Sequence, residues 1–142
     1  MAVLVTTRDA EGCMHSRAMS LASRMYLVLR AKLHIDIVPD DGLHFLFVSD
    51  ITSAKQDEIN TVDQVNISFL EPSSTSWVSV CGSAQINQDP EQIKKLWNPM
   101  VSAWFGDLGD GVHKGDASDP RVCVIKVIPS SVSEHVHRKI SF

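Results

Sequence analysis

Short apolar runs separated by turn residues recur along most of the chain, and this pattern is typical of β-strands. We predict strands over residues 2–7, 13–21, 25–38, 43–48, 64–70, 77–86, 121–128 and 132–136. The first two flank a turn and are expected to form a hairpin. The alternation in 77–86 puts Val78, Val80 and Ala84 on one face, and Trp77, Ser79, Cys81 and Ser83 on the other. Gly82 inside this run predicts a bulge or a bend.

Two helical regions interrupt the strands. Residues 54–60 follow a group of capping residues and predict a short helix. Asp89-Pro90-Glu91 predicts the start of a second helix, because a cap, a proline and an acid suit the first turn. Pro99 predicts a kink or a restart of this helix. Residues 106–119 hold four of the seven glycines and predict a long loop.

The predicted fold is therefore mainly β, a β-barrel with a few α-helices. The order of the elements matches neither repeated βαβ units nor a plain sandwich. It favours a split barrel of Greek-key type with helices over its openings. A chain of 142 residues is expected to form one domain over residues 1–142.

Composition and charge narrow the classes of function. The chain is 44% hydrophobic and 21% charged, as in ordinary globular proteins, so disorder and coiled coil are not expected. Acidic residues outnumber basic ones by 17 to 13, and the net charge of −4 gives no support for a nucleic-acid binder. One phosphate held by a local pair of basic side chains stays compatible with this charge.

The cysteines and the apolar segments bear on the location of the protein. Cys13, Cys81 and Cys123 form no CxxC pair and predict free thiols in a reducing cytosol. No signal peptide is visible. The most apolar stretch, 25–38, contains charges and is shorter than the roughly 20 residues of a membrane helix. We therefore expect a cytoplasmic protein without a membrane segment.

Two basic residues are candidate ligands of a phosphate. Residues 49–55 end a hydrophobic strand, supply hydroxyls and open a helix with Lys55 in its first turn. A helix start and a lysine together suit a phosphate. Arg17 lies in an extended segment and could supply a bidentate fork to the same group. The alternatives are a solvated lysine on a capped helix and an exposed arginine on an edge strand.

The remaining candidates are aromatic residues and histidines. Trp97 and Trp104 are seven residues apart, so an unbroken helix would carry both on one face that could cover a planar cofactor. A core or a dimer interface is the alternative. His135 and His137 share one side of a predicted strand, but no carboxylate or cysteine is placed to complete a metal site, so no bound metal is expected.

Nine short segments, taken together in their order and spacing, point to a known family. They are Val3-Leu4-Val5-Thr6-Thr7, Ser16-Arg17-Ala18-Met19, Ser53-Ala54-Lys55, Asn66-Ile67-Ser68-Phe69, the run 77–84, Leu96-Trp97-Asn98-Pro99-Met100, Ala103-Trp104-Phe105, the run 106–111 and Asp119-Pro120-Arg121. No single motif is decisive, and together they cover most of the chain. In this order they resemble the pyridoxamine 5'-phosphate oxidase-like FMN-binding split-barrel family, in its general stress protein branch with the fungal blue-light-induced members.

The resemblance implies a homodimer with FMN in a groove between the subunits. Arg17 and Lys55, helped by Ser53, would bind the phosphate. The segments around Ala18, Met19, Val48 and Ser49 would line the ring and the ribityl chain, Trp77 and Val78 would approach from the neighbouring strand, and Trp104 would come from the partner subunit.

The sequence departs from the family at three places. It starts at the first strand, where the family usually has a preceding helix. Residues 24–38 look like an insertion, either an extended hairpin or the translation of a retained intron. The basic substrate grip of the vitamin B6 oxidase is missing, since Ser20-Leu21-Ala22 and His135-Val136-His137-Arg138 stand in its place.

The expected function is accordingly that of an FMN-binding flavoprotein, with flavin-dependent redox chemistry on a small molecule if it is an enzyme. The alternatives are a non-enzymatic flavin carrier or sensor and a structural dimer module that has lost the cofactor. A true pyridoxamine 5'-phosphate oxidase is less expected.

Overall fold

The computed structural model describes residues 2–21, 44–73 and 75–135. The predicted strand 25–38, the inserted segment 24–38 and His137 lie outside these residues. Within them, no helix combines the length and the apolar character that crossing a membrane requires.

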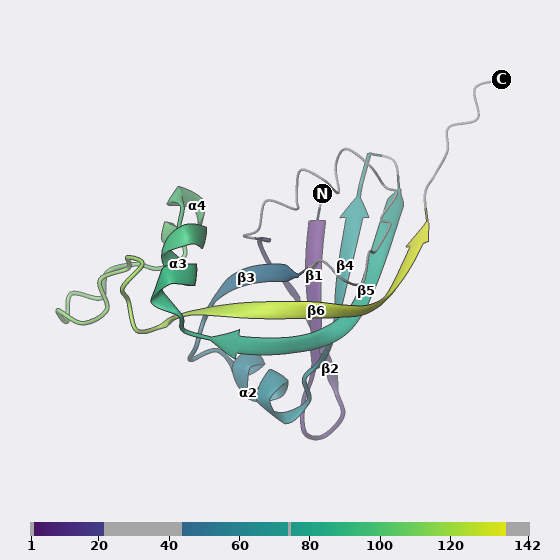
Figure 1. Ribbon diagram of the computed structural model, residues 1–142, viewed down its shortest axis with the longest axis horizontal. Coiled ribbons are helices and arrows are strands. Elements are labelled where there is room, and N and C mark those ends of the chain that lie inside the picture. The colour runs from purple at the N-terminus through teal and green to yellow at the C-terminus, as the bar shows by residue number, and fades with distance from the viewer. Residues whose placement is uncertain (1, 22–43, 74, 136–142) are drawn as a thin grey trace.

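The described residues contain six strands: β1 Ala2–Arg8, β2 Met14–Ala18, β3 Phe45–Asp50, β4 Gln64–Glu71, β5 Ser76–Asn87 and β6 Val122–His135. They form one antiparallel sheet with the order β2-β1-β4-β5-β6-β3. The sheet curls on itself (Figure 1), and a bridge between Leu21 and Phe47 joins the segment after β2 to the edge strand β3. The mainly β prediction is confirmed, and so is the hairpin of the first two strands.

Alternation along the strands builds the core inside the curled sheet. The predicted inward face of β5 is confirmed, because Val78, Val80 and Ala84 are all buried. Phe47 is fully buried in β3. A second apolar cluster, which includes Val101 and Phe105, packs at the start of β6. The fold therefore has a barrel interior and a smaller core under its C-terminal helices.

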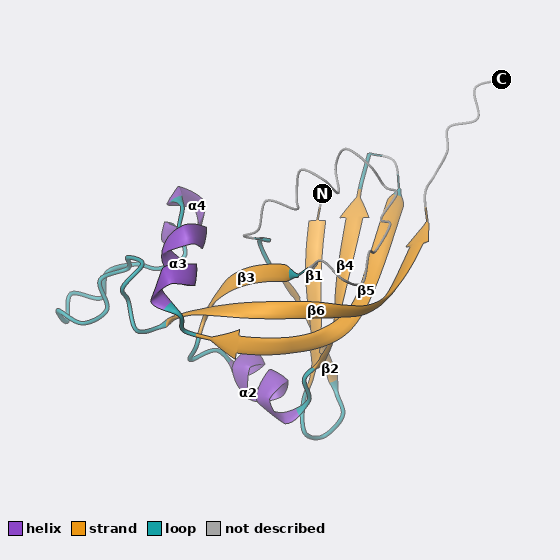
Figure 2. Ribbon diagram, in the orientation of Figure 1, coloured by secondary structure: helices purple, strands orange, loops and turns teal. Residues whose placement is uncertain are grey.

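In the part of the chain that the structure describes, three helices cover the ends of the sheet (Figure 2): α2 Ala54–Thr61, α3 Pro90–Leu96 and α4 Pro99–Ser102. The predicted break before Pro99 is confirmed. Asn98 caps α4, since its side-chain oxygen accepts hydrogen bonds from the backbone N–H of Met100 and of Val101 at 2.9 and 3.2 Å. Trp97 and Trp104 consequently do not share the face of one helix.

The last strand differs from the prediction of two separate strands at 121–128 and 132–136. Residues Val122–His135 form one strand, and the register shifts where Cys81 and Gly82 face it. Pro129 faces Gly82 at this shift, and a proline is tolerated where a bulge interrupts the ladder. The bulge predicted at Gly82 is confirmed.

Gly82→Ala is expected to lower the free energy of unfolding by about 1–3 kcal/mol, because overpacking forces the backbone to shift. A Cβ at this position would lie 2.4 Å from the carbonyl oxygen of Ile128. Gly106→Ala is the matched control, since a Cβ there meets nothing within 4 Å. Urea unfolding measures both, and equal stability of the two variants would contradict the close approach at Gly82.

Candidate functional site

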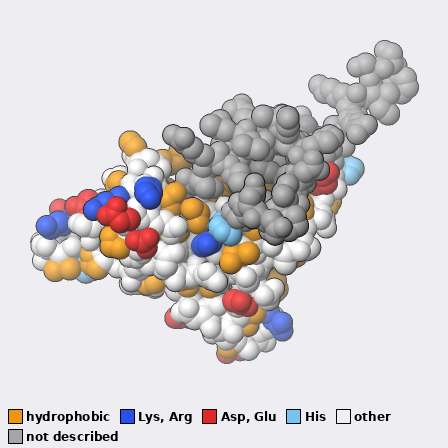
Figure 3. All heavy atoms as spheres, viewed as in Figure 1, with side chains coloured by type: hydrophobic (Ala, Val, Ile, Leu, Met, Phe, Trp, Pro, Cys, Tyr) orange, Lys and Arg blue, Asp and Glu red, His pale blue; other side chains and the backbone are white. Residues whose placement is uncertain are grey.

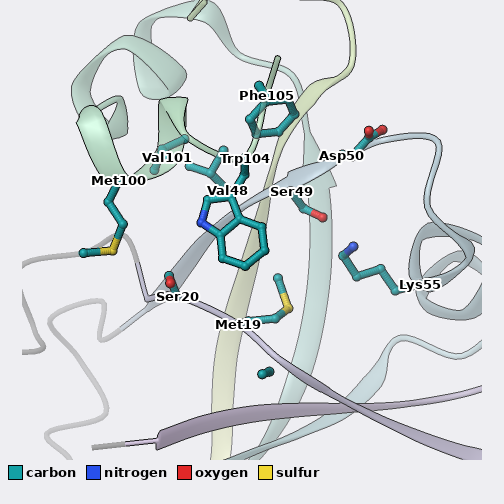
Figure 4. A pocket seen from close by; sticks show the side chains of 11 residues that line it. Met19, Ser20, Val48, Ser49, Asp50, Lys55, Met100, Val101, Trp104 and Phe105 are labelled. Atoms are coloured by element: carbon teal, nitrogen blue, oxygen red, sulfur yellow. The ribbon is translucent and has the colours of Figure 1, made fainter. Parts of the chain in front are cut away.

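A pocket of about 220 Å³ lies where the two apolar clusters meet. Four separate segments build it: the end of β2 with the residues that follow, the end of β3, the first turn of α2, and α4 with the turn that follows (Figure 4). Its lining consists of Ala18, Met19, Ser20, Val48, Ser49, Asp50, Lys55, Met100, Val101, Trp104 and Phe105.

A tight turn after β3 places Lys55 at the pocket. The Asp50 carboxylate accepts hydrogen bonds from the backbone N–H and the hydroxyl of Thr52 at 2.8 and 2.7 Å. The Asp50 carbonyl accepts a hydrogen bond from the Ser53 hydroxyl at 2.9 Å. The chain then enters α2 one residue later, so the local hydroxyls that predicted a helix start also fix the position of the lysine.

Lys55 has free donors at this place. Its ammonium donates to the Ser53 hydroxyl at 2.6 Å, and no carboxylate of the described residues forms a salt bridge with it. Burial lowers the pKa of Lys55 below its ordinary value. The ammonium points toward the space between Ser49, Met19 and Trp104 (Figure 4). An ammonium has three N–H donors, so two can still serve an anion.

Arg17 is engaged elsewhere, although the sequence pairs it with Lys55. Its guanidinium donates to both carboxylate oxygens of Glu58, each at 2.6 Å, and to the Thr7 hydroxyl at 2.9 Å. The hydrogen bond from Arg17 lowers the pKa of Glu58. Sequence reasoning missed Glu58, because its position opposite Arg17 depends on how α2 packs over the end of the barrel.

The other predicted site residues fall into two groups. Ala18, Met19, Val48, Ser49 and Trp104 line the pocket together with Lys55, and Ser53 contacts the lysine from outside the lining. The structure places Trp104 at the pocket of its own chain, and its contribution to a partner's site stays a prediction.

Trp77 and Val78 lie away from this pocket. Val78 is buried in the barrel core. Trp77 is 42% exposed on the outside of the sheet, where its ring stacks on His135 with 6.2 Å between the centroids. A role of these two residues toward a cofactor also stays a prediction.

A buried ion pair behind the pocket was missed as well. Asp119 accepts hydrogen bonds from the Arg121 guanidinium at 3.0 and 2.7 Å, and Arg121 also donates to the Gly106 carbonyl at 2.8 Å. This pair lies next to Phe105, whose ring faces the Arg121 guanidinium at 5.9 Å.

 The same loop contains Gly115, whose φ of +68° lies in the left-handed region that favours glycine, as does the φ of +73° at Gly109. At Gly115 a Cβ would also lie 2.2 Å from the carbonyl oxygen of Phe105, so this loop requires glycine there.

Comparison with known proteins gives the family. The family model described as "Pyridoxamine 5'-phosphate oxidase like" matches residues 33–134, which is more than half of the chain. The chain belongs to the pyridoxamine 5'-phosphate oxidase-like family. Within this family, it is 40% identical over 125 residues to the protein bli-3 of Neurospora crassa. The match covers 87% of this chain and 53% of that relative, so the chain spans about half the length of bli-3.

Solved structures confirm the split-barrel fold of this member of the pyridoxamine 5'-phosphate oxidase-like family. A protein related to general stress protein 26 from Clostridium acetobutylicum superimposes with a TM-score of 0.68 at 15% identity, over 96% of this chain and 80% of that one. The general stress FMN/FAD-binding protein of Xanthomonas citri has a TM-score of 0.68 at 20% identity, over 99% and 83% of the two chains. At these identities the similarity shows the fold alone.

Proposed function

We propose that this chain is a flavoprotein that binds FMN in the pocket, with the phosphate at Lys55. The observation that carries the proposal is an ammonium with free donors at one end of a pocket with largely apolar walls. A planar aromatic ring needs apolar walls, and its phosphate needs a charged donor. Membership of the pyridoxamine 5'-phosphate oxidase-like family and the FMN/FAD-binding protein of Xanthomonas citri support the same ligand class.

The described residues fit the parts of FMN in different ways. The Trp104 indole and the Met19 thioether face the space in which a flat ring would lie (Figure 4). Lys55 would donate to the phosphate, and the Ser53 hydroxyl would orient the lysine. When bound, FMN supplies the redox chemistry, and the protein supplies position and electrostatics. The proposed activity is therefore a flavin-dependent redox reaction on a small molecule.

We also propose that a second copy of the chain completes the site. The pocket of one chain, about 220 Å³, is smaller than the roughly 300–1,000 Å³ of usual ligand sites. Met100 and Trp104 at its edge are 65% and 76% exposed. On the face shown in Figure 3, hydrophobic side chains are exposed beside the charged end that carries α3 and α4. Exposed apolar surface of this kind suits a contact between subunits.

The visible absorption spectrum of the purified protein, with identification of any released ligand, tests the cofactor. A yellow protein that releases FMN is the expected result. A colourless protein that takes up no added FMN would overturn the proposal. Oxygen uptake with pyridoxine phosphate would favour the vitamin B6 oxidase, and sedimentation of the same sample at several concentrations tests the homodimer.

Lys55→Ala is expected to weaken FMN binding by about 10- to 150-fold, because a hydrogen bond to a charged group contributes about 1.5–3 kcal/mol. Binding of riboflavin, which has no phosphate, should change little. Lys95→Ala is the matched control, since Lys95 is an exposed lysine of α3. Titration of flavin fluorescence measures all three proteins, and an equal loss for FMN and riboflavin would place the phosphate away from Lys55.

A further inference from the structure

Two cations bear on the pocket, Lys55 in its lining and Arg17 near that lysine. Of the two, only Lys55 has no carboxylate bound to it among the residues that the structure describes. Lys55 has donors to spare, whereas the Arg17 guanidinium makes a bidentate contact with Glu58 at 2.6 Å for each oxygen. Glu58 is 7% exposed, and its carboxylate also accepts a hydrogen bond from the buried Thr7 hydroxyl. A phosphate does not easily take Arg17 from this carboxylate, because Glu58 would then be a buried charge without its main partner.

The pair of Arg17 and Glu58 lies next to the pocket. Arg17 and Met19 are two residues apart in an extended segment, so their side chains leave the same face, and Met19 lines the pocket. Glu58 follows Lys55 by three residues in α2, which puts the two side chains on neighbouring positions of one helix face. The ion pair of Arg17 and Glu58 thus joins two of the four segments that build the pocket.

The electrostatics agree with this placement. Burial is the main cause that lowers the pKa of Lys55; the positive charge of Arg17 lowers it further, and the negative charges of Asp50 and Glu58 raise it. Both members of the pair therefore act on the ammonium. Asp50 also lines the pocket, and its carboxylate is already bound by the backbone and the hydroxyl of Thr52.

We propose that Glu58 sets how strongly the site prefers a phosphorylated flavin, by neutralising Arg17 and thereby leaving Lys55 as the cation that binds the phosphate. In this arrangement Arg17 is a positioning residue that holds α2 against the hairpin of β1 and β2. Its charge is cancelled at the site by a carboxylate of its own chain. The inference rests on the proposed binding of FMN and goes beyond it by assigning the phosphate preference to Glu58.

The test is the ratio of the dissociation constants of riboflavin and FMN, measured by flavin fluorescence for the wild type and four variants. Glu58→Gln is expected to raise the ratio about fivefold, because a negative charge near the phosphate is removed. Arg17→Gln is expected to lower it about fivefold, because Glu58 is then an unbalanced negative charge. The double variant R17Q/E58Q is expected to return to the ratio of the wild type. Glu91→Gln, an exposed acid of α3, is the control for loss of a distant charge.

The double variant separates the proposal from a direct role of Arg17. If Arg17 itself binds the phosphate, R17Q/E58Q stays as weak for FMN as R17Q, and the inference is overturned. If the pair only stabilises the fold, the affinities of both flavins fall together and the ratio stays constant, which overturns it as well. Should E58Q fail to fold, R17Q and R17Q/E58Q decide together, because the proposal requires the ratio to fall in R17Q and to return to the wild-type value in the double variant.

Flavin binding by the wild type distinguishes a failure of the proposed FMN binding from a failure of the role assigned to Glu58. A wild-type protein that binds neither flavin overturns the proposed function, and the inference with it. A wild-type protein that prefers FMN, combined with an E58Q variant of unchanged ratio, overturns the inference alone.

Discussion

Asp119→Ala is expected to lower the free energy of unfolding by about 3 kcal/mol, because removing one partner of a buried ion pair leaves the other without compensation. The Asp119 side chain is fully buried, and it accepts hydrogen bonds from the Arg121 guanidinium and from the backbone N–H of Gly115 at 2.9 Å. The substitution would therefore release the loop before β6 together with Arg121. Urea unfolding followed by circular dichroism measures the loss.

Asp116→Ala is the matched control for this experiment. Asp116 lies in the same loop and also accepts local hydrogen bonds from Ser118, but it is exposed. We expect a much smaller change than at Asp119. Similar losses for the two variants would contradict the role assigned to the buried pair.

Because the Asp119 carboxylate is charged in the folded protein, we expect the stability of the protein to depend on pH. The hydrogen bond from Arg121 holds the pKa of Asp119 well below its usual range near 4. A lowered folded-state pKa contributes stability that is complete above the unfolded-state pKa and is lost as the pH falls through the folded-state value. The difference in stability between wild type and Asp119→Asn should thus be constant near neutral pH and shrink below about pH 4. A difference that stays constant down to pH 2 would contradict this assignment.

Phe47→Ala is expected to lower the free energy of unfolding by about 3–5 kcal/mol, the usual cost of truncating a buried phenylalanine. Phe47 has no exposed surface, belongs to the barrel core and forms the bridge to Leu21. Its neighbour Val48 lines the pocket, so we also expect the variant to lose affinity for a ligand there. Chemical denaturation and flavin titration measure the two effects.

Two further variants test whether the loss comes from the cavity. Phe47→Leu keeps most of the apolar volume and should cost clearly less than Phe47→Ala. Leu108→Ala truncates an apolar side chain that is 61% exposed and should change stability little. A loss at Leu108 as large as that at Phe47 would contradict the assignment of the core.

Features with a local cause were predictable from the sequence. Alternation along 77–86 predicts the buried face of β5, because consecutive residues of a strand point to opposite faces of the sheet. Gly82 predicts the bulge from its own position in the strand. Pro99 predicts the break between α3 and α4 for the same reason. The placement of Lys55 at the start of a helix also follows from its near neighbours.

Features that depend on distant segments were not predictable in the same way. Glu58 forms an ion pair with Arg17, from which it is separated by 41 positions in the sequence. Nothing in the local sequence around either residue specifies this partner. The break expected after residue 128 is absent, because β5 supplies the bulge that accommodates Pro129. Trp77 illustrates the same limit, since its alternation with Val78 is correct but does not tell which face borders the pocket.

The pairing of β3 has a consequence for synthesis of the chain. Val48 and Ser49 hydrogen-bond to β6, the last of the described strands, and not to a strand next to them in sequence. A ribosome adds about 5–20 residues per second, so β3 is made several seconds before its partner strand β6. Closing such a distant pair carries a large loop entropy and delays folding. The pocket is therefore assembled only when β6 has been made, and truncated nascent chains cannot hold a ligand there.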